Sequence, residues 1–156
     1  MISGLILAFG IGVVGGLRSM TAPAVVAWAA HLGWMNLSGS SLAFMGSRWS
    51  VFAFTILALG EFVGDLLPST PARTAALPLT ARIVIGAAVG ASVAIAGGFF
   101  LWLGSVCGLS GAVAGAFGGY RARANLVREL HVPDAAIAIP EDLIAVGLGL
   151  LLVTRF

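Results

Sequence analysis

Two carboxylates stand inside an otherwise apolar segment of the chain. Glu61 and Asp65 are four residues apart, so on a helix they share one face. A charged side chain at membrane depth costs roughly 3 kcal/mol on insertion scales, and such groups therefore face a partner or a wet cavity. Arg18 is the natural partner of Glu61, and Arg82 is the second candidate. Three interpretations stay open: an ion pair that fixes helix packing, a polar site that binds a small anion or relays protons, and snorkelling to the interface.

Polar groups next to Arg18 suggest an anion site. Ser19, Thr21 and the backbone amides around Ala22 and Pro23 would lie at the N-terminus of a half-helix if the first helix breaks there. An arginine-rich site favours an anionic solute or a lipid headgroup, whereas a Glu/Asp site favours protons or cations, and the sequence does not choose between them. The predicted binding residues are Arg18, Ser19, Thr21, Glu61, Asp65, Arg73 and Arg82.

The composition predicts that lipid surrounds these residues. Of the 156 residues 60% are hydrophobic and 9% are charged, and the mean hydropathy is +1.08. A soluble domain carries about a quarter charged residues, and a chain this short buries only about two-thirds of the surface that it exposes when unfolded. We therefore expect an all-α bundle of transmembrane helices in a lipid bilayer, with residues 1–156 as a single domain.

Several classes of function are disfavoured by the sequence. The net charge of +2 is too small for binding nucleic acid. Cys107 is the single cysteine and no cysteine–histidine spacing suggests zinc, while His31 and His131 are isolated. The chain has no nucleophile-elbow, Walker or His-Glu-x-x-His motif. We therefore expect no enzyme activity, no metal and no cofactor.

About twenty apolar residues cross a bilayer core, and the sequence predicts about five spans. The stretch 83–119 carries no charge and would be about 55 Å long as one helix, so it must fold back on itself. Gly104–Gly108 is the expected turn. After it, Val132–Pro140 is expected to form a loop, and Glu141 and Asp142 to open the last helix. The predicted spans are Ile2–Leu17, Trp49–Leu67, Leu79–Leu103, Ser105–Tyr120 and Leu143–Val153.

The first helix is expected to be broken. Two interpretations compete: one long tilted helix kinked near Pro23, or a spanning helix that breaks at Gly15-Gly16 and is followed by a half-helix. Proline is tolerated in a first helical turn, where its missing N–H has no partner to lose. Thr21 precedes Ala22-Pro23 as a plausible N-cap. We favour the broken helix.

The arginines and a short repeat bear on topology. With five spans, Arg18, Arg48 and Arg155 fall on the side opposite the N-terminus and the other five arginines on the same side as it. The positive-inside rule then predicts a cytoplasmic N-terminus. Gly15-Gly16-Leu17-Arg18 recurs as Gly118-Gly119-Tyr120-Arg121, and three intervening spans would make the two halves an inverted repeat, a feature of transporters.

Several segments spread along the chain form a recognisable pattern: Gly16–Pro23 with Ala27-Trp28, Glu61–Asp65 with Pro68, Pro71–Thr74, Arg82 with Gly86-Ala87, and Pro140–Leu143. Through these segments most of the chain resembles a bacterial family labelled domain of unknown function 4126. The resemblance implies a small polytopic protein of the bacterial inner membrane without an assigned reaction. It supplies no substrate.

The leading functional hypothesis is a small transporter or channel that moves a small solute or ion, with an anion as one candidate, through a polar site of arginine and carboxylate side chains. We expect a homo-oligomer, because five short spans enclose little pathway alone. The alternative is a membrane scaffold or assembly partner that transports nothing, with Arg18 and Glu61 fully paired. A membrane-embedded enzyme acting on lipid is a weaker third hypothesis, since no nucleophile–base pair is found.

Overall fold

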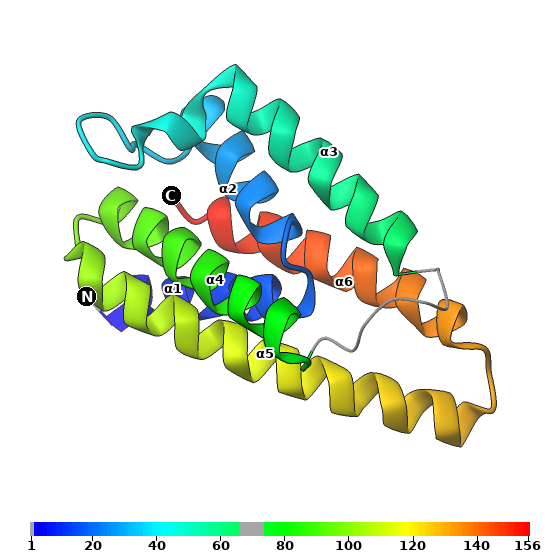
Figure 1. Cartoon of the computed structure of the whole chain (residues 1–156). Coiled ribbons are helices and arrows are strands. Elements are labelled where there is room, and N and C mark those ends of the chain that lie inside the picture. The colour runs from blue at the N-terminus through cyan, green and yellow to red at the C-terminus, as the bar shows by residue number, and fades with distance from the viewer. Residues whose placement is uncertain (1, 66–73) are drawn as a thin grey trace.

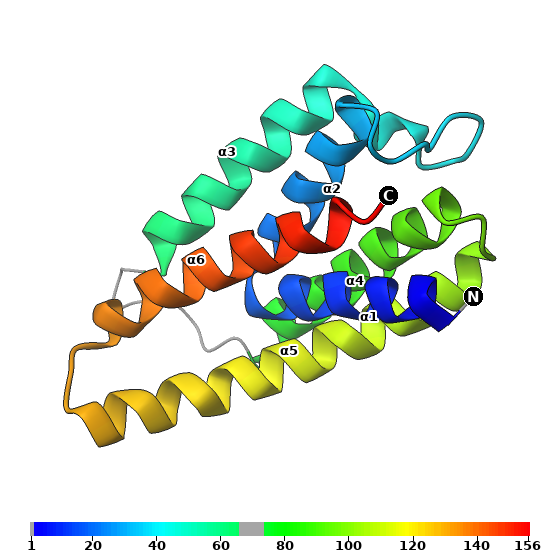
Figure 2. The ribbon, with the colours of Figure 1, turned by 180° about the vertical axis from the view of Figure 1, so that it is seen from behind.

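A computed structural model of the chain describes residues 2–65 and 74–156, and every regular element in these residues is helical. The predicted all-α bundle is confirmed, and Figures 1 and 2 show it from opposite sides. The elements are α1 (Ile2–Leu17), α2 (Thr21–His31), the short 3-10 helix η1 (Ala43–Gly46), α3 (Arg48–Gly64), α4 (Ala76–Ala96), α5 (Leu101–Leu130) and α6 (Asp134–Val153).

Three of the described helices are long and apolar enough to cross a membrane, namely α4, α5 and the part of α6 from Ala136 to Val153; α1 is a shorter apolar helix. Helices α1, α3, α4, α5 and α6 lie where the five spans were predicted, and α2 lies where the half-helix was expected. Because α2 also returns the chain to the end at which it began, the order of sides differs from that of the five-span prediction. The 30 residues of α5 extend about 45 Å, which exceeds a hydrocarbon core of roughly 30 Å. The end of α5, which carries the charged residues after Tyr120, therefore projects beyond the apolar part of the bundle.

Helices α1, α4 and α5 pack with their backbones in contact. A Cβ added at Gly108 of α5 would overlap the carbonyl oxygen of Gly86 and would lie 2.9 Å from the Cα of Gly90, both in α4. On the other side, a Cβ at Gly16 of α1 would lie 2.8 Å from the Cα of Gly115. Lipid gives helices little hydrophobic drive to associate, so close packing of small residues takes its place. We call these glycine contacts the glycine seam.

The same contacts fix the directions of the helices. Along α1 and α5 the contacting residues advance together, because Gly12 approaches Gly108 and Gly16 approaches Gly115. These two helices are therefore parallel. Helix α4 lies beside α5 and is joined to it by a tight turn at residues 97–100. Helix α4 therefore runs in the opposite direction.

The remaining helices continue this alternation. The Met20 N–H bonds to Glu61, and Trp28, further along α2, bonds to Thr55, which comes earlier in α3. Helices α2 and α3 are therefore antiparallel. Both chain termini lie at one end of the bundle in Figures 1 and 2. We call this the terminal end, and we call the opposite end, which contains the break at residues 18–20, the break end.

This order changes the distribution of arginines. The prediction grouped Arg18 with Arg48 and Arg155, but α2 turns back toward the terminal end, so Arg18 lies at the other end from those two. The remaining described arginines, Arg82, Arg121, Arg123 and Arg128, also belong to the break end.

The two copies of the short repeat are not related by inversion. Gly15–Arg18 closes α1, whereas Gly118–Arg121 lies inside the continuous helix α5. Helices α1 and α5 run in the same direction, so an inverted relation between these copies is wrong. The environments differ as well, because Arg18 is fully buried and Arg121 is exposed.

The predicted turn at Gly104–Gly108 is also wrong. These residues lie in the first turns of α5, and the chain reverses earlier, where Gly98 takes the left-handed conformation at φ 71°. Gly104 and Gly108 both face α4. Sequence reasoning took a local cluster of glycines as a turn signal, but their role is close helix packing.

The predicted loop at Val132–Pro140 is helical from Asp134 onward, and Pro140 lies inside α6. Glu141 and Asp142 therefore belong to the interior of the helix and do not complement its N-terminal dipole. Proline removes one backbone hydrogen bond but is tolerated in membrane helices whose neighbours satisfy the freed group. The two acidic side chains are available for tertiary contacts.

Candidate functional site

The first helix is interrupted as predicted. Helix α1 ends at Leu17, and α2 begins at Thr21 with Met20 as its N-cap residue. The prediction that Thr21 is the N-cap is wrong. The side chain of Met20 makes no capping hydrogen bond to the free backbone N–H groups. The break lies just after Gly15-Gly16 and exposes the N–H groups of Ser19 and Met20.

The carboxylate of Glu61 binds these exposed groups. Its Oε1 accepts hydrogen bonds from the Ser19 N–H at 2.8 Å and the Ser19 hydroxyl at 2.7 Å, and its Oε2 accepts one from the Met20 N–H at 2.9 Å. A half-helix N-terminus attracts anions because its amides point outward and the helix dipole is positive there. The Ser19 and Met20 groups beside the predicted anion site are therefore bound to a carboxylate of the same chain.

Arg82 from α4 completes this arrangement. One of its Nη atoms lies 3.3 Å from Oε1 of Glu61, and the other donates to the carbonyl oxygen of Gly16 at 2.8 Å. That carbonyl belongs to the last turn of α1, where the helix dipole is negative. The Arg82–Glu61 pair thus satisfies both ends of the break, with the cation at one and the anion at the other. Arg82, the second candidate partner of Glu61, is confirmed.

Arg18 is placed differently from the prediction. Its side chain is 0% exposed. One Nη atom lies 2.7 Å from Oδ2 of Asp65, the other contacts Oδ1 of Asp142, and the guanidinium carbon lies 5.5 Å from the centre of the Phe62 ring. The prediction that Arg18 pairs with Glu61 is therefore wrong, although both belong to one group of charges.

Two fully buried polar atoms beside the break have no hydrogen-bond partner among the described residues. They are Nε of Arg18 and the hydroxyl oxygen of Thr21, and Thr21 is 1% exposed. Buried polar groups are nearly always hydrogen-bonded, to protein, water or ligand. These two atoms lie on either side of the residues that hold Glu61.

The structure adds three residues that the sequence did not assign to the site. Nη1 of Arg123 lies 2.9 Å from Oδ2 of Asp65 and 3.5 Å from Oε2 of Glu141, and Asp142 contacts Arg18. A signal existed: Arg123 follows Gly119 by four residues and continues the small-residue face of α5 that is buried against the bundle.

We call the resulting group the charge cluster. It draws three guanidinium and four carboxylate groups from the ends and interiors of five helices: Arg18, Glu61, Asp65, Arg82, Arg123, Glu141 and Asp142. Of the predicted binding residues, Arg18, Ser19, Glu61, Asp65 and Arg82 come together, and Thr21 lies beside them. Arg73 lies outside the described residues.

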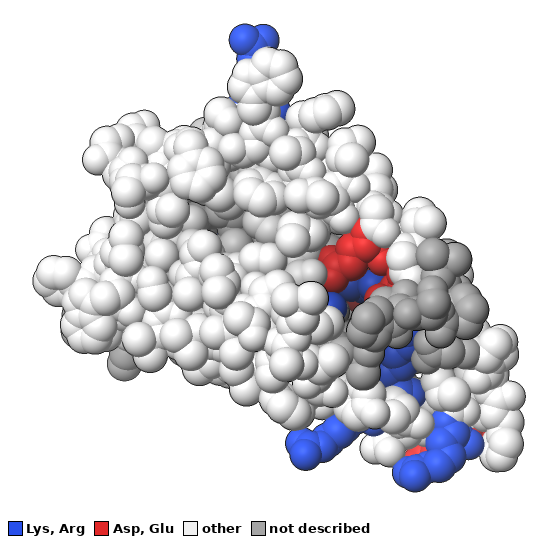
Figure 3. Space-filling model, viewed as in Figure 1, with Lys and Arg blue, Asp and Glu red and all other residues white. Residues whose placement is uncertain are grey.

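The charge cluster opens toward one side of the molecule. Most of the face in Figure 3 is uncharged, but acidic and basic side chains appear together in a recess where the end of α3 approaches the bundle. The arginine at the centre, Arg18, is inaccessible, whereas the carboxylates of Glu61 and Asp142 are 13% and 17% exposed. Arg123 is 12% exposed, so partly exposed side chains of both signs surround the innermost cation.

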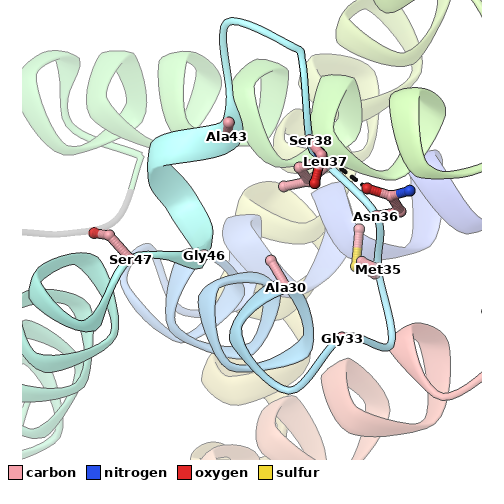
Figure 4. A pocket seen from close by; sticks show the side chains of 9 residues that line it. All are labelled: Ala30, Gly33, Met35, Asn36, Leu37, Ser38, Ala43, Gly46 and Ser47. Carbon is pink, nitrogen blue, oxygen red and sulfur yellow. Dashed lines mark hydrogen bonds between the residues drawn. The ribbon is translucent and has the colours of Figure 1, made fainter.

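A separate pocket lies at the terminal end and shares no residue with the charge cluster. It holds about 480 Å³ and lies beside the loop between α2 and α3 (Figure 4). Asn36 there accepts a hydrogen bond from the Ser38 N–H, which shapes the loop. The lining carries no ionisable side chain: Ala30, Gly33, Met35, Asn36, Leu37, Ser38, Ala43, Gly46 and Ser47.

Helices of transmembrane length, an apolar exterior and buried charges together define a multi-pass α-helical membrane protein. Within that class, the chain belongs to the family described as Domain of unknown function (DUF4126), whose model matches residues 5–154. The family resemblance noted from the sequence is confirmed. No curated protein and no solved structure matches the chain.

Proposed function

We propose that the protein transports a small solute or ion across the membrane through the charge cluster. The observation that carries this proposal is the broken first helix, whose two ends are held by Arg82 and Glu61. Discontinuous helices of this kind form substrate sites in many transporters, because their free backbone groups can bind ions. No enzyme activity, metal or cofactor is part of the proposal.

The energetics support a role beyond packing. Each charge inserted near the centre of a membrane helix costs roughly 3 kcal/mol. Replacing buried ion pairs by apolar side chains of similar size is often neutral or stabilising. The glycine seam already packs α1, α4 and α5 together without any charge. Seven charged side chains at one place are therefore better explained by a function that needs them.

We further propose that the protein lies in the bacterial inner membrane with the break end toward the cytoplasm. Five described arginines lie at the break end and two at the terminal end, and cytoplasmic flanks are rich in arginine and lysine. This orientation reverses the prediction of a cytoplasmic N-terminus, because that prediction did not count α2 as returning the chain to the side of the N-terminus.

The proposed transport unit contains more than one copy of the chain. Helix α3 buries few side chains in a single copy, and Trp49, Phe52 and Val63 on it are more than half exposed. Such a helix can border a second copy as well as lipid. Native mass spectrometry in detergent distinguishes a monomer from an oligomer, and a monomer would contradict this part of the proposal.

Flux in proteoliposomes tests transport. Vesicles holding the wild-type chain and an internal pH-sensitive dye receive gradients of potassium, chloride and lactate in turn. We expect at least one gradient to move protons or its own ion faster than in protein-free vesicles. Glu61→Gln should remove this flux, and Arg48→Gln, which changes an exposed arginine at the terminal end, should keep it. Rates equal to those of empty vesicles for every gradient would count against transport.

A membrane scaffold is the second candidate. It is favoured by the four hydrogen bonds or ionic contacts that Glu61 makes within the chain. For a scaffold, Glu61→Gln should lower stability without any flux to lose. Inactive wild-type vesicles that contain correctly folded protein would favour this candidate.

A further inference from the structure

We propose that Glu61 occupies the binding site of a small monocarboxylate, and that this anion enters together with one proton that neutralises Glu61. The inference rests on the proposed transport function and names its substrate class. The proton binds the Glu61 carboxylate, the neutral side chain leaves its position, and the incoming carboxylate takes over the released hydrogen bonds. No other bond forms or breaks.

The geometry of the site selects a carboxylate. Its donors are arranged for a planar group with two oxygens: Ser19 provides two to one oxygen, and Met20 provides one to the other. Arg82 adds one positive charge at 3.3 Å. A phosphate or sulfate would bring further oxygens and a second negative charge. A single carboxylate reproduces the group that the site already holds.

The charges around Glu61 require the proton. Arg82 faces it from α4, Arg18 lies at the end of α1, and Asp65 lies one turn further along α3. From α6 come Glu141 and Asp142, and from α5 comes Arg123, all through the same network. Changing the net charge of a buried group of ions is costly. An anion alone or a proton alone changes that charge, whereas an anion and a proton together leave it unaltered.

The surroundings also contain buried polar atoms that could bind a ligand. Nε of Arg18 and the Thr21 hydroxyl are fully buried and have no hydrogen-bond partner among the described residues. Arg18 and Thr21 flank Ser19 and Met20 in the sequence. Polar atoms without a hydrogen-bond partner among the described residues therefore lie on both sides of the residues that bind the Glu61 carboxylate. The Glu61 side chain is 13% exposed, and the recess in Figure 3 leads to acidic and basic side chains. Part of the Glu61 side chain is therefore accessible from outside the bundle.

Acetate binding to the purified full-length chain tests the inference. The protein in detergent is titrated with sodium acetate, and sodium chloride at equal ionic strength serves as the control. Thermal unfolding monitors binding, because a ligand of the folded state raises Tm. If each acetate brings one proton, the apparent Kd of the wild type rises about tenfold for each unit by which the pH is raised. In Glu61→Ala the site is vacant, so acetate should bind without this pH dependence.

Glu129→Ala is the matched control, since it removes an exposed carboxylate on α5 outside the charge cluster. It should keep the wild-type slope. No difference between acetate and chloride, or a wild-type Kd that does not change with pH, overturns the inference. If Glu61→Ala does not fold, the wild-type slope decides alone. Vesicle flux is measured separately. Flux without acetate binding leaves transport standing and removes this inference. Binding without flux leaves the carboxylate site standing and removes its role in transport.

Discussion

The glycine seam and the charge cluster both hold α1, α4 and α5 together, by opposite means. In the seam, backbones touch because residues such as Gly16 and Gly108 have no side chain. In the cluster, long side chains from α1, α3, α4, α5 and α6 meet through opposite charges. The seam needs no polar group and gains van der Waals contact. The comparison shows that close glycine packing can stabilise this bundle without burying charges. The presence of the charge cluster therefore requires a different explanation.

The largest effect is expected from removing the central cation. Arg18→Ala leaves Asp65 and Asp142 without the guanidinium between them, and breaking a buried pair costs about 3–5 kcal/mol. Denaturation in mixed micelles should show this loss. Arg155→Ala, at an exposed position near the C-terminus, should change little. The double variant Arg18→Ala/Asp142→Asn should regain part of the stability; no recovery would mean that the two charges are not coupled.

A smaller loss is expected in the seam. Gly108→Ala places a methyl group against the Gly86 carbonyl, and overpacking typically costs about 1–3 kcal/mol. The matched control is Gly118→Ala, because a Cβ at Gly118 meets nothing within 4 Å. Thermal unfolding in detergent compares the two. Equal melting temperatures would show that α4 and α5 can separate without penalty. Flux per folded molecule should stay unchanged in Gly108→Ala, in contrast with the cluster variants.

The smallest effect concerns the edge of the cluster. Ser19→Ala removes one hydrogen bond to a carboxylate, at 2.7 Å, and leaves the backbone N–H bonds to Glu61. Such a bond to a charged group is worth about 1.5 kcal/mol. Ser105→Ala is the control, since that hydroxyl bonds only to a carbonyl of its own helix. A loss as large as that of Arg18→Ala would mean that Ser19 positions the whole break.

Residue types and spacing were sufficient for several features. The apolar composition required a membrane bundle, Gly15-Gly16 followed by Pro23 indicated the broken helix, and Glu61 with Asp65 identified the helix face that carries the site. These features depend on local properties: the hydration cost of a charge, the missing N–H of proline and the period of the helix. Local properties act within a few residues, so they can be read along the chain.

Tertiary structure decided which charge meets which. Arg18 lies next in sequence to the residues that bind Glu61, yet its guanidinium turns to Asp65 and Asp142, while Arg82 takes Glu61. The glycines at 104 and 108, expected in a turn, pack against α4, and Arg123 joins the cluster because α5 continues past Gly119. Each of these outcomes depends on the distance of closest approach between helices far apart in sequence. Periodicity gives the face of a helix, but only packing determines which other helix that face meets and at what depth.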